Sequence, residues 1–126
     1  PKTYLLHGDL HHENILLDEE RGWVAIDPKG VVGPRLMECG RYLHNVMQDE
    51  IQDIGEIDEA GDSQLLEIFE TRFKTFSEML KADYWDIVAS AYIDLVLSSC
   101  WSINGGQVVC YNRIRVLKKF IKDSRP

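Results

Sequence analysis

The amino-acid sequence predicts an α+β domain in which one short β-hairpin precedes a bundle of helices. Its 126 residues, 44% hydrophobic and 28% charged, have the size and composition of a single globular domain with its own core. Short apolar runs alternate with polar turns in the first third of the chain. From residue 35 onward the apolar residues recur every three or four positions, as on one face of a helix. This change of period gives the fold class.

The expected strands are short and lie near the start of the chain. Residues 4–6 form an apolar run that ends at a polar cluster, and residues 15–17 and 23–26 are predicted strands joined by a turn. The two strands of a hairpin run antiparallel, so the start of one lies beside the end of the other. We therefore expect the polar loop before the first strand to lie beside the loop after the second.

Helices are expected in the remainder of the chain, because its apolar residues follow helical spacing. Trp23, Trp85 and Trp101 fall at hairpin or helix positions where we expect them to face the core. The expected helices are residues 35–49 after Pro34, a helix N-capped by Asp62 or Ser63 that continues to Leu80, one N-capped by Asp83 and stopped by Gly105 and Gly106, and one around Val116, Leu117 and Phe120.

The net charge of −7, from 14 Lys and Arg against 21 Asp and Glu, argues against nucleic acid or an anionic membrane as the main partner. Three cysteines without a CxxC pair indicate reduced thiols in a cytoplasmic protein. The apolar stretch 87–103 is interrupted by Asp94 and by serines, and it is short for a membrane span. Asp94 indicates either a group facing a substrate cleft or a member of a buried polar network.

An acidic segment at residues 49–62 separates the first two expected helices, and it contains no Lys or Arg. Such a run of charge is usually a solvated loop. The alternative is a binding site for a polycationic substrate.

Three polar residues form a pattern typical of catalysis. Asp9 and Asn14 lie five positions apart in the first polar loop, and Asp27 arrives at the same end of the predicted hairpin. Carboxylate and amide oxygens suit Mg²⁺, which also takes substrate phosphates, so Asn14 and Asp27 are candidates to hold Mg–nucleotide. Asp9 is left to accept a proton from an attacking hydroxyl. A Zn²⁺ or Fe²⁺ hydrolase site that uses the histidines of residues 7–12 is the alternative, although their spacing matches neither HxHxDH nor HExxH.

The string His7-Gly8-Asp9-Leu10-His11-His12-Glu13-Asn14 resembles the catalytic loop of kinase-like phosphotransferases, and Asp27 resembles their metal-binding aspartate. Together with residues 23–33, it is most similar to the aminoglycoside phosphotransferases, in particular the streptomycin 6-kinase and hydroxyurea-resistance kinase group. The resemblance is dense over residues 5–43 and general, as a helical lobe, beyond them. It implies the mainly helical C-terminal lobe of the protein-kinase-like fold, with ATP and Mg²⁺ as cofactors.

The resemblance also implies roles for individual residues. Asp9 is the implied catalytic base, Asn14 and Asp27 are the implied Mg²⁺ ligands, and His7 matches a position that braces the loop. Two further residues stand where this sequence departs from the common pattern. Glu38 takes the place of the last acid of a Gly-Asp-Pro-x-x-Asp motif, and His11 takes the place of the lysine of protein kinases. Lys29 is then a candidate to supply charge that faces the phosphates.

The implied activity is transfer of the γ-phosphate of ATP to a hydroxyl of a cationic or polyhydroxylated small molecule, as in antibiotic resistance. Streptomycin carries guanidinium groups that the acidic segment 49–62 could bind. Similar proteins phosphorylate choline, homoserine, methylthioribose or fructosamines, so another small alcohol and a non-catalytic binding module remain alternatives. No glycine-rich loop or Val-Ala-x-Lys strand precedes Asp9. We therefore expect residues 1–126 to form one C-terminal lobe without the nucleotide-clamping N-terminal lobe, and to be inactive alone.

Overall fold

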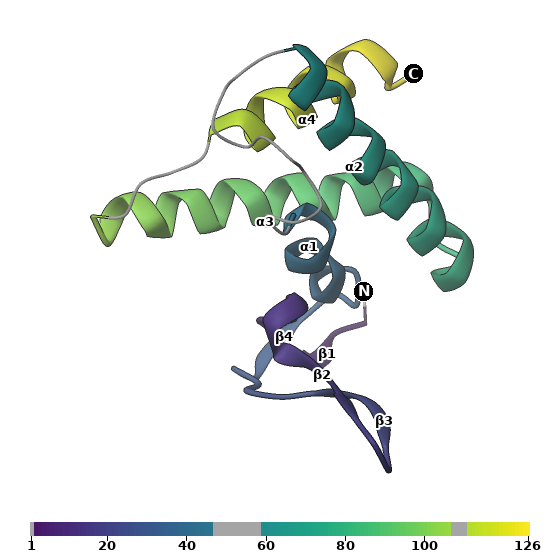
Figure 1. Cartoon of the computed structure of the whole chain (residues 1–126), viewed down its shortest axis with the longest axis vertical. Coiled ribbons are helices and arrows are strands. Elements are labelled where there is room, and N and C mark those ends of the chain that lie inside the picture. Colours follow the sequence, from purple (N-terminus) through teal and green to yellow (C-terminus); the bar gives the residue numbers. More distant parts are fainter. Residues whose placement is uncertain (1, 47–58, 107–110) are drawn as a thin grey trace.

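The computed structural model describes residues 2–46, 59–106 and 111–126, with only the backbone described at positions 59 and 60. Within these residues the fold is α+β and mostly helical, as predicted, with two small antiparallel sheets and four α-helices. Figure 1 shows the strands at one end of the molecule and the long helix α3 (Tyr84–Asn104) across its middle. Helix α1 (Met37–His44) lies between the strands and α3.

The hairpin is confirmed. Strand β2 (Ile15–Asp18) pairs antiparallel with β3 (Gly22–Ala25), and Ile15 lies opposite Ala25. The structure adds a strand that the sequence analysis did not predict, β4 (Val31–Gly33), which pairs with β1 (Tyr4–Leu6). This pairing brings the ends of the two polar loops together, as expected. The amides of Lys29 and Gly30 in the second loop donate to the carbonyl of His7 in the first, at 2.7 and 3.1 Å.

Three helix boundaries differ from the prediction. Helix α1 begins two residues later than expected, because residues 34–36 form tight turns in which Pro34 O accepts from Met37 N at 3.0 Å. It ends at His44, since Asn45 is extended, and the remainder of the expected first helix, residues 47–49, lies outside the described residues. Helix α2 (Glu59–Leu80) begins before Asp62, so the expected N-cap at Asp62 or Ser63 is wrong.

The boundaries of α3 are confirmed, and the last helix, α4 (Tyr111–Ser124), lies where it was expected. The side chain of Asp83 accepts from the amides of Trp85 and Asp86 at 2.9 and 3.2 Å, which satisfies two donors of the first turn. After α3 the chain continues through Gly105 to Gly106, whose φ of 75° is a conformation that glycine adopts without strain.

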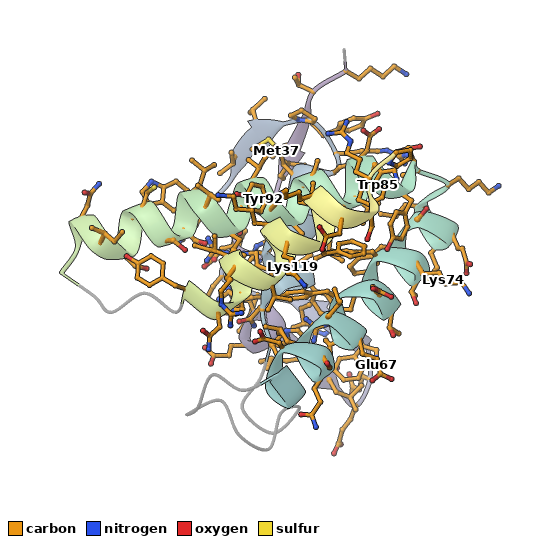
Figure 2. The ribbon with its side chains drawn as sticks, turned by 90° about the horizontal axis from the view of Figure 1, so that it is seen from above. Met37, Glu67, Lys74, Trp85, Tyr92 and Lys119 are labelled. Atoms are coloured by element: carbon orange, nitrogen blue, oxygen red, sulfur yellow. The ribbon has the colours of Figure 1, made fainter. Side chains whose placement is uncertain are left out.

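The core lies among the four helices, with α3 at its centre. Figure 2 shows Trp85 and Tyr92 of α3 beside α4, and Trp85 stacks on Phe120 with ring centroids 5.7 Å apart. Trp23 and Trp101, which were expected to face the core, are instead 72% and 61% exposed. The largest fully buried side chains are Phe69, Phe73, Leu43, Ile87, Leu95, Leu117 and Val88.

Among the helices of the described residues, only α3 is long and apolar enough to cross a membrane on length and composition. Its buried residues, which include Ile87, Val88, Ala91 and Leu95, belong to the core cluster that α3 shares with α1, α2 and α4. A central bundle helix has these same properties. The prediction that stretch 87–103 does not span a membrane stays a prediction.

Gly40 allows α1 to approach α3 closely, and we predict that Gly40→Ala destabilises the chain. A Cβ at this position would lie 2.6 Å from the carbonyl oxygen of Ser90 and 2.8 Å from Cβ of Asp94. The two helix backbones must move apart to relieve these contacts, at a cost of about 1–3 kcal/mol in the free energy of unfolding. Urea denaturation measures this loss. Gly105→Ala is the matched control, because its Cβ would lie 3.4 Å or more from its neighbours, and equal stability of the two variants would contradict the prediction.

Candidate active site

One carboxylate of α1 binds two backbone amides at the start of the loop between β1 and β2. Glu38, near the start of α1, accepts from the amide of His7 at 2.6 Å and from the amide of Gly8 at 3.1 Å. Position 8 favours glycine, because its φ is 85° and a Cβ there would lie 2.7 Å from Cγ2 of Val31 in β4. Glu38 therefore holds the start of the loop against the helix.

His7 joins the two polar loops. Its Nε2 lies 2.6 Å from the carbonyl oxygen of Ile26, and its Nδ1 accepts from the amide of Asp9 at 3.2 Å. Both bonds are satisfied by the tautomer that carries its proton on Nε2. Both ring nitrogens of His7 therefore have hydrogen-bond partners. The bond from the backbone amide of Asp9 to Nδ1 helps to orient Asp9.

Asp9, the expected catalytic base, lies where the first loop, the β3–β4 loop and α1 meet. Its side chain is 15% exposed. Oδ1 is 3.3 Å from Nη1 of Arg41. Oδ2 is 3.4 Å from Nζ of Lys29, 3.5 Å from Nδ2 of Asn14 and 3.7 Å from Nε2 of His11. Four of the predicted site residues are therefore brought together: Asp9, His11, Asn14 and Lys29.

Asn14 is buried and links the loop to the hairpin. Its Nδ2 donates to the carbonyl oxygen of Asp9 at 2.9 Å, and its own carbonyl accepts from the amide of Ile26 at 2.9 Å. Its amide oxygen makes no hydrogen bond within the part of the chain that the structure describes. Asp27 follows directly after Ile26, with a φ of 54° that is uncommon for a non-glycine residue.

These two residues fit a hard cation. The carboxylate of Asp27 is exposed and makes no hydrogen bond or ion pair with the described residues. The amide oxygen of Asn14 also has no hydrogen-bond partner among them. A carboxylate and an amide oxygen at the same end of one hairpin are ligands that Mg²⁺ accepts. The alternative zinc or iron site receives no support, since residues 2–46, 59–106 and 111–126 contain no group of three His, Cys, Asp or Glu side chains placed to hold a metal.

Arg41, which lies behind Asp9, was not predicted from the sequence. Arg41 of α1 also donates from Nε to Oδ2 of Asp94 on α3 at 3.0 Å, and Nε2 of His44 lies 2.6 Å from the same oxygen. Asp94 thus belongs to a polar network between two helices, one of the two alternatives that the sequence left open. Burial alone would raise the pKa of Asp94, but the hydrogen bond from His44 and the charge of Arg41 outweigh burial and lower this pKa.

His44 is the buried end of this network. It is 4% exposed, and its Nδ1 has no hydrogen-bond partner among the described residues. Burial lowers the pKa of His44 below its ordinary value and outweighs the opposing effect of Asp94. The neutral ring therefore donates from Nε2 to Asp94, because a proton on Nδ1 would be buried without an acceptor.

We predict that His44 makes the stability of the chain depend on pH. Its pKa is lower in the folded chain than the unfolded value of about 6.5, so the unfolded chain binds more protons between these two values. The contribution of His44 to the free energy of unfolding is fully present above about pH 6.5. It is lost as the pH falls toward the folded pKa of His44, by up to about 1.4 kcal/mol per pH unit. Urea unfolding of the chain and of His44→Gln between pH 8 and 5, in steps of about half a unit, measures this slope.

Gln keeps a donor near the position of Nε2 but does not titrate, so His44→Gln should have a smaller slope than the unsubstituted chain. Arg41, Arg113 and Asp94, the charged groups that face His44, are unchanged in that variant. Identical slopes in the two proteins would contradict the prediction.

A second contact set ties α2 to the same loop. Arg72 donates from Nη1 to the carbonyls of Tyr42 and Asn45 at 3.1 and 2.7 Å, which satisfies acceptors at the end of α1. The ring of Tyr42 stacks on His12 with centroids 4.2 Å apart. The loop that carries Asp9 is therefore supported by α1, α2 and, through Asp94, by α3.

This chain belongs to the aminoglycoside/hydroxyurea antibiotic resistance kinase family, whose family model matches residues 2–106. It is 52% identical over 40 residues to a streptomycin 3''-kinase of Klebsiella pneumoniae, a match that covers 32% of this chain and 15% of that protein. It is 28% and 27% identical over 106 residues to streptomycin 6-kinases of Streptomyces griseus and Streptomyces glaucescens. These matches cover 84% of this chain and 32% of each relative, so the chain spans a third or less of their lengths. No solved structure matches it.

Proposed function

We propose that this chain carries the catalytic loop and the metal ligands of an ATP-dependent small-molecule phosphotransferase. The observation that supports the proposal most strongly is the meeting of the two polar loops. Oδ2 of Asp9 lies 3.4 Å from Nζ of Lys29 in the second loop. At the same end of the hairpin, Asn14 and Asp27 have side-chain oxygens without a hydrogen-bond partner among the described residues. Membership of a kinase family supports the same assignment.

In this proposal Asp9 takes the proton of the acceptor hydroxyl as its oxygen attacks the γ-phosphorus of ATP. A new O–P bond forms, the bond from the γ-phosphorus to the bridging oxygen breaks, and ADP leaves. Asn14 and Asp27 would hold Mg²⁺, which neutralises charge on the phosphates when bound. Lys29 is 65% exposed, so its ammonium can leave Asp9 and face the phosphates. Glu38, His7 and His11 keep the loop in place.

The proposed substrate is a cationic aminoglycoside such as streptomycin. Three relatives are named as streptomycin kinases, and their names differ in the position on streptomycin. The net charge of −7 favours a cationic substrate. Most of the acidic segment 49–62 lies outside the described residues, and Asp62 at its end is paired with Arg115 at 2.6 Å. We propose that the other acids of segment 49–62 contribute to binding of the cationic substrate.

We also propose that the chain acts as the catalytic and substrate-binding lobe, and that a nucleotide-clamping lobe elsewhere in a longer protein completes the ATP site in the cytoplasm. Matches over 15–32% of the length of the relatives fit such a division. Phosphoryl transfer depends on positioning, so the chain alone should bind ATP weakly and turn over slowly.

The test is a transfer assay with the full gene product, meaning the longest protein that contains this chain, and with the chain itself. Each is incubated with Mg²⁺, γ-labelled ATP and a panel of streptomycin, other aminoglycosides, hydroxyurea, choline and homoserine. Label on streptomycin supports the proposed substrate, and the position of the phosphate separates a 3''-kinase from a 6-kinase. Label on another acceptor keeps the mechanism and rejects the antibiotic. Transfer to no acceptor would favour the alternative of a non-catalytic binding module.

A further inference from the structure

The two carboxylate oxygens of Asp9 have different surroundings. Oδ1 faces Nη1 of Arg41 at 3.3 Å. Oδ2 faces Nζ of Lys29 at 3.4 Å, Nδ2 of Asn14 at 3.5 Å and Nε2 of His11 at 3.7 Å. The side chain of Lys29 is 65% exposed, and that of Arg41 is 24% exposed. Ion pairs of exposed lysines are weak and exchange readily with water. The contact of Lys29 with Oδ2 is therefore easily released, and the contact of Arg41 with Oδ1 is not. The other two contacts of Oδ2 are long, at 3.5 Å to Asn14 and 3.7 Å to His11.

Arg41 is held from its other side. Its Nε donates to Oδ2 of Asp94 at 3.0 Å, and the same oxygen accepts from the buried His44 at 2.6 Å. The guanidinium is planar and rigid, so a bond on Nε and a bond on Nη1 together fix its orientation. Gly40 lets α1 and α3 approach closely at this point, since a Cβ there would lie 2.8 Å from Cβ of Asp94. Two helices thus set the position of the cation that Asp9 contacts.

We infer that Arg41 is a positioning residue, which anchors Oδ1 of Asp9 so that Oδ2 is presented to the acceptor hydroxyl, and that Asp94 in turn anchors Arg41. This inference rests on the proposed phosphotransfer function. When Lys29 turns toward the phosphates, Oδ2 keeps only its longer contacts with Asn14 and His11 and can accept the proton, while Oδ1 stays bound to Arg41. A base held in one orientation contributes to kcat, because a displacement of about 1 Å costs on the order of 10²-fold in rate.

The kinetic test uses the full gene product with Arg41→Ala, Arg41→Lys and Asp94→Asn. Arg41→Ala should lower kcat by about 10–100-fold and change the KM for ATP by less than about threefold. Arg41→Lys should recover part of kcat, because a single ammonium can contact Asp9 but cannot bridge Asp9 and Asp94. Asp94→Asn should also lower kcat, because it removes the charge that holds the guanidinium of Arg41 in position against Asp9.

Arg115→Ala is the matched control, since it removes an ion pair between α2 and α4 with distances of 2.6 and 2.9 Å to Asp62. Its kcat should stay within about twofold of the unsubstituted protein. An equal loss of kcat in Arg41→Ala and Arg115→Ala, in step with their loss of stability, would overturn the inference. So would a rise in the KM for ATP without a change in kcat.

A second measurement separates the failure of this inference from the failure of the proposed function. The ¹³C carboxyl signal of Asp9, recorded by NMR on the chain, should shift in Arg41→Ala and in Asp94→Asn but not in Arg115→Ala. Unchanged signals in the first two variants overturn the anchoring whether or not the protein transfers phosphate. If the unsubstituted full product transfers none, the proposed function fails, and the NMR signals still decide whether Arg41 and Asp94 hold Asp9.

Discussion

Replacing Asp9 by Asn should lower kcat of the full gene product by about 10²–10⁴-fold, the usual contribution of a positioned general base. Asn has nearly the same shape and can still approach Arg41, but its amide cannot accept the proton of the attacking hydroxyl. The Mg–ATP dissociation constant should change by less than about threefold, because no proposed metal ligand is altered. Steady-state kinetics and titration calorimetry measure the two quantities.

Asp18→Asn is the control for this change. Asp18 lies at the β2–β3 turn and pairs with Arg21 at 3.3 Å, so the same substitution is made on the hairpin but outside the proposed site. Its kcat should be unchanged. Similar turnover in Asp9→Asn and Asp18→Asn would remove Asp9 from the reaction.

Replacing Asp27 by Ala should weaken binding of Mg–ATP by about 10–100-fold or more, as loss of support at a metal site commonly does. The Mg²⁺ concentration needed for half-maximal activity should rise with it, and high Mg²⁺ should restore part of the rate. Asn14→Ala should show the same loss together with a lower kcat, because Asn14 Nδ2 also holds the backbone of Asp9 at 2.9 Å.

Glu19→Ala removes one exposed acid from the turn at the other end of the hairpin and serves as the control for charge. Titration calorimetry with Mg–ATP compares the variants. Equal affinities in Asp27→Ala and Glu19→Ala would contradict a metal-binding role for Asp27.

The features that the sequence predicted correctly depend on neighbours along the chain. The hairpin follows from two apolar runs and a turn, and the cap at Asp83 follows from an acid directly before a helical pattern. The meeting of the two polar loops follows from the hairpin itself. Each of these arguments needs fewer than about 20 residues of context, within the range of local turn and periodicity signals.

The features that were missed depend on distant contacts. Strand β4 has three residues and becomes a strand only because β1 lies beside it. Arg41 and Asp94 are 53 residues apart in the sequence, and an acid on an apolar helix gives no sign of its partner. The exposure of Trp23 was not predicted, because the alternation of residues along β3 does not reveal which face of a two-stranded sheet is covered. A glycine inside the helical pattern, Gly40, is the signal in the sequence that indicates a close helix contact at this point.

Paramagnetic mapping with Mn²⁺–ATP would locate the metal site in the full gene product, observed at the amide signals of this chain. Mn²⁺ accepts the same oxygen ligands as Mg²⁺ and broadens the NMR signals of nearby nuclei. If Asn14 and Asp27 hold the metal, the amide signals of Asn14, Ile26 and Asp27 should broaden first, while those of α4 remain sharp. Broadening centred on acids elsewhere, such as Glu67 and Glu70 of α2, or no preference for the hairpin end, would contradict it.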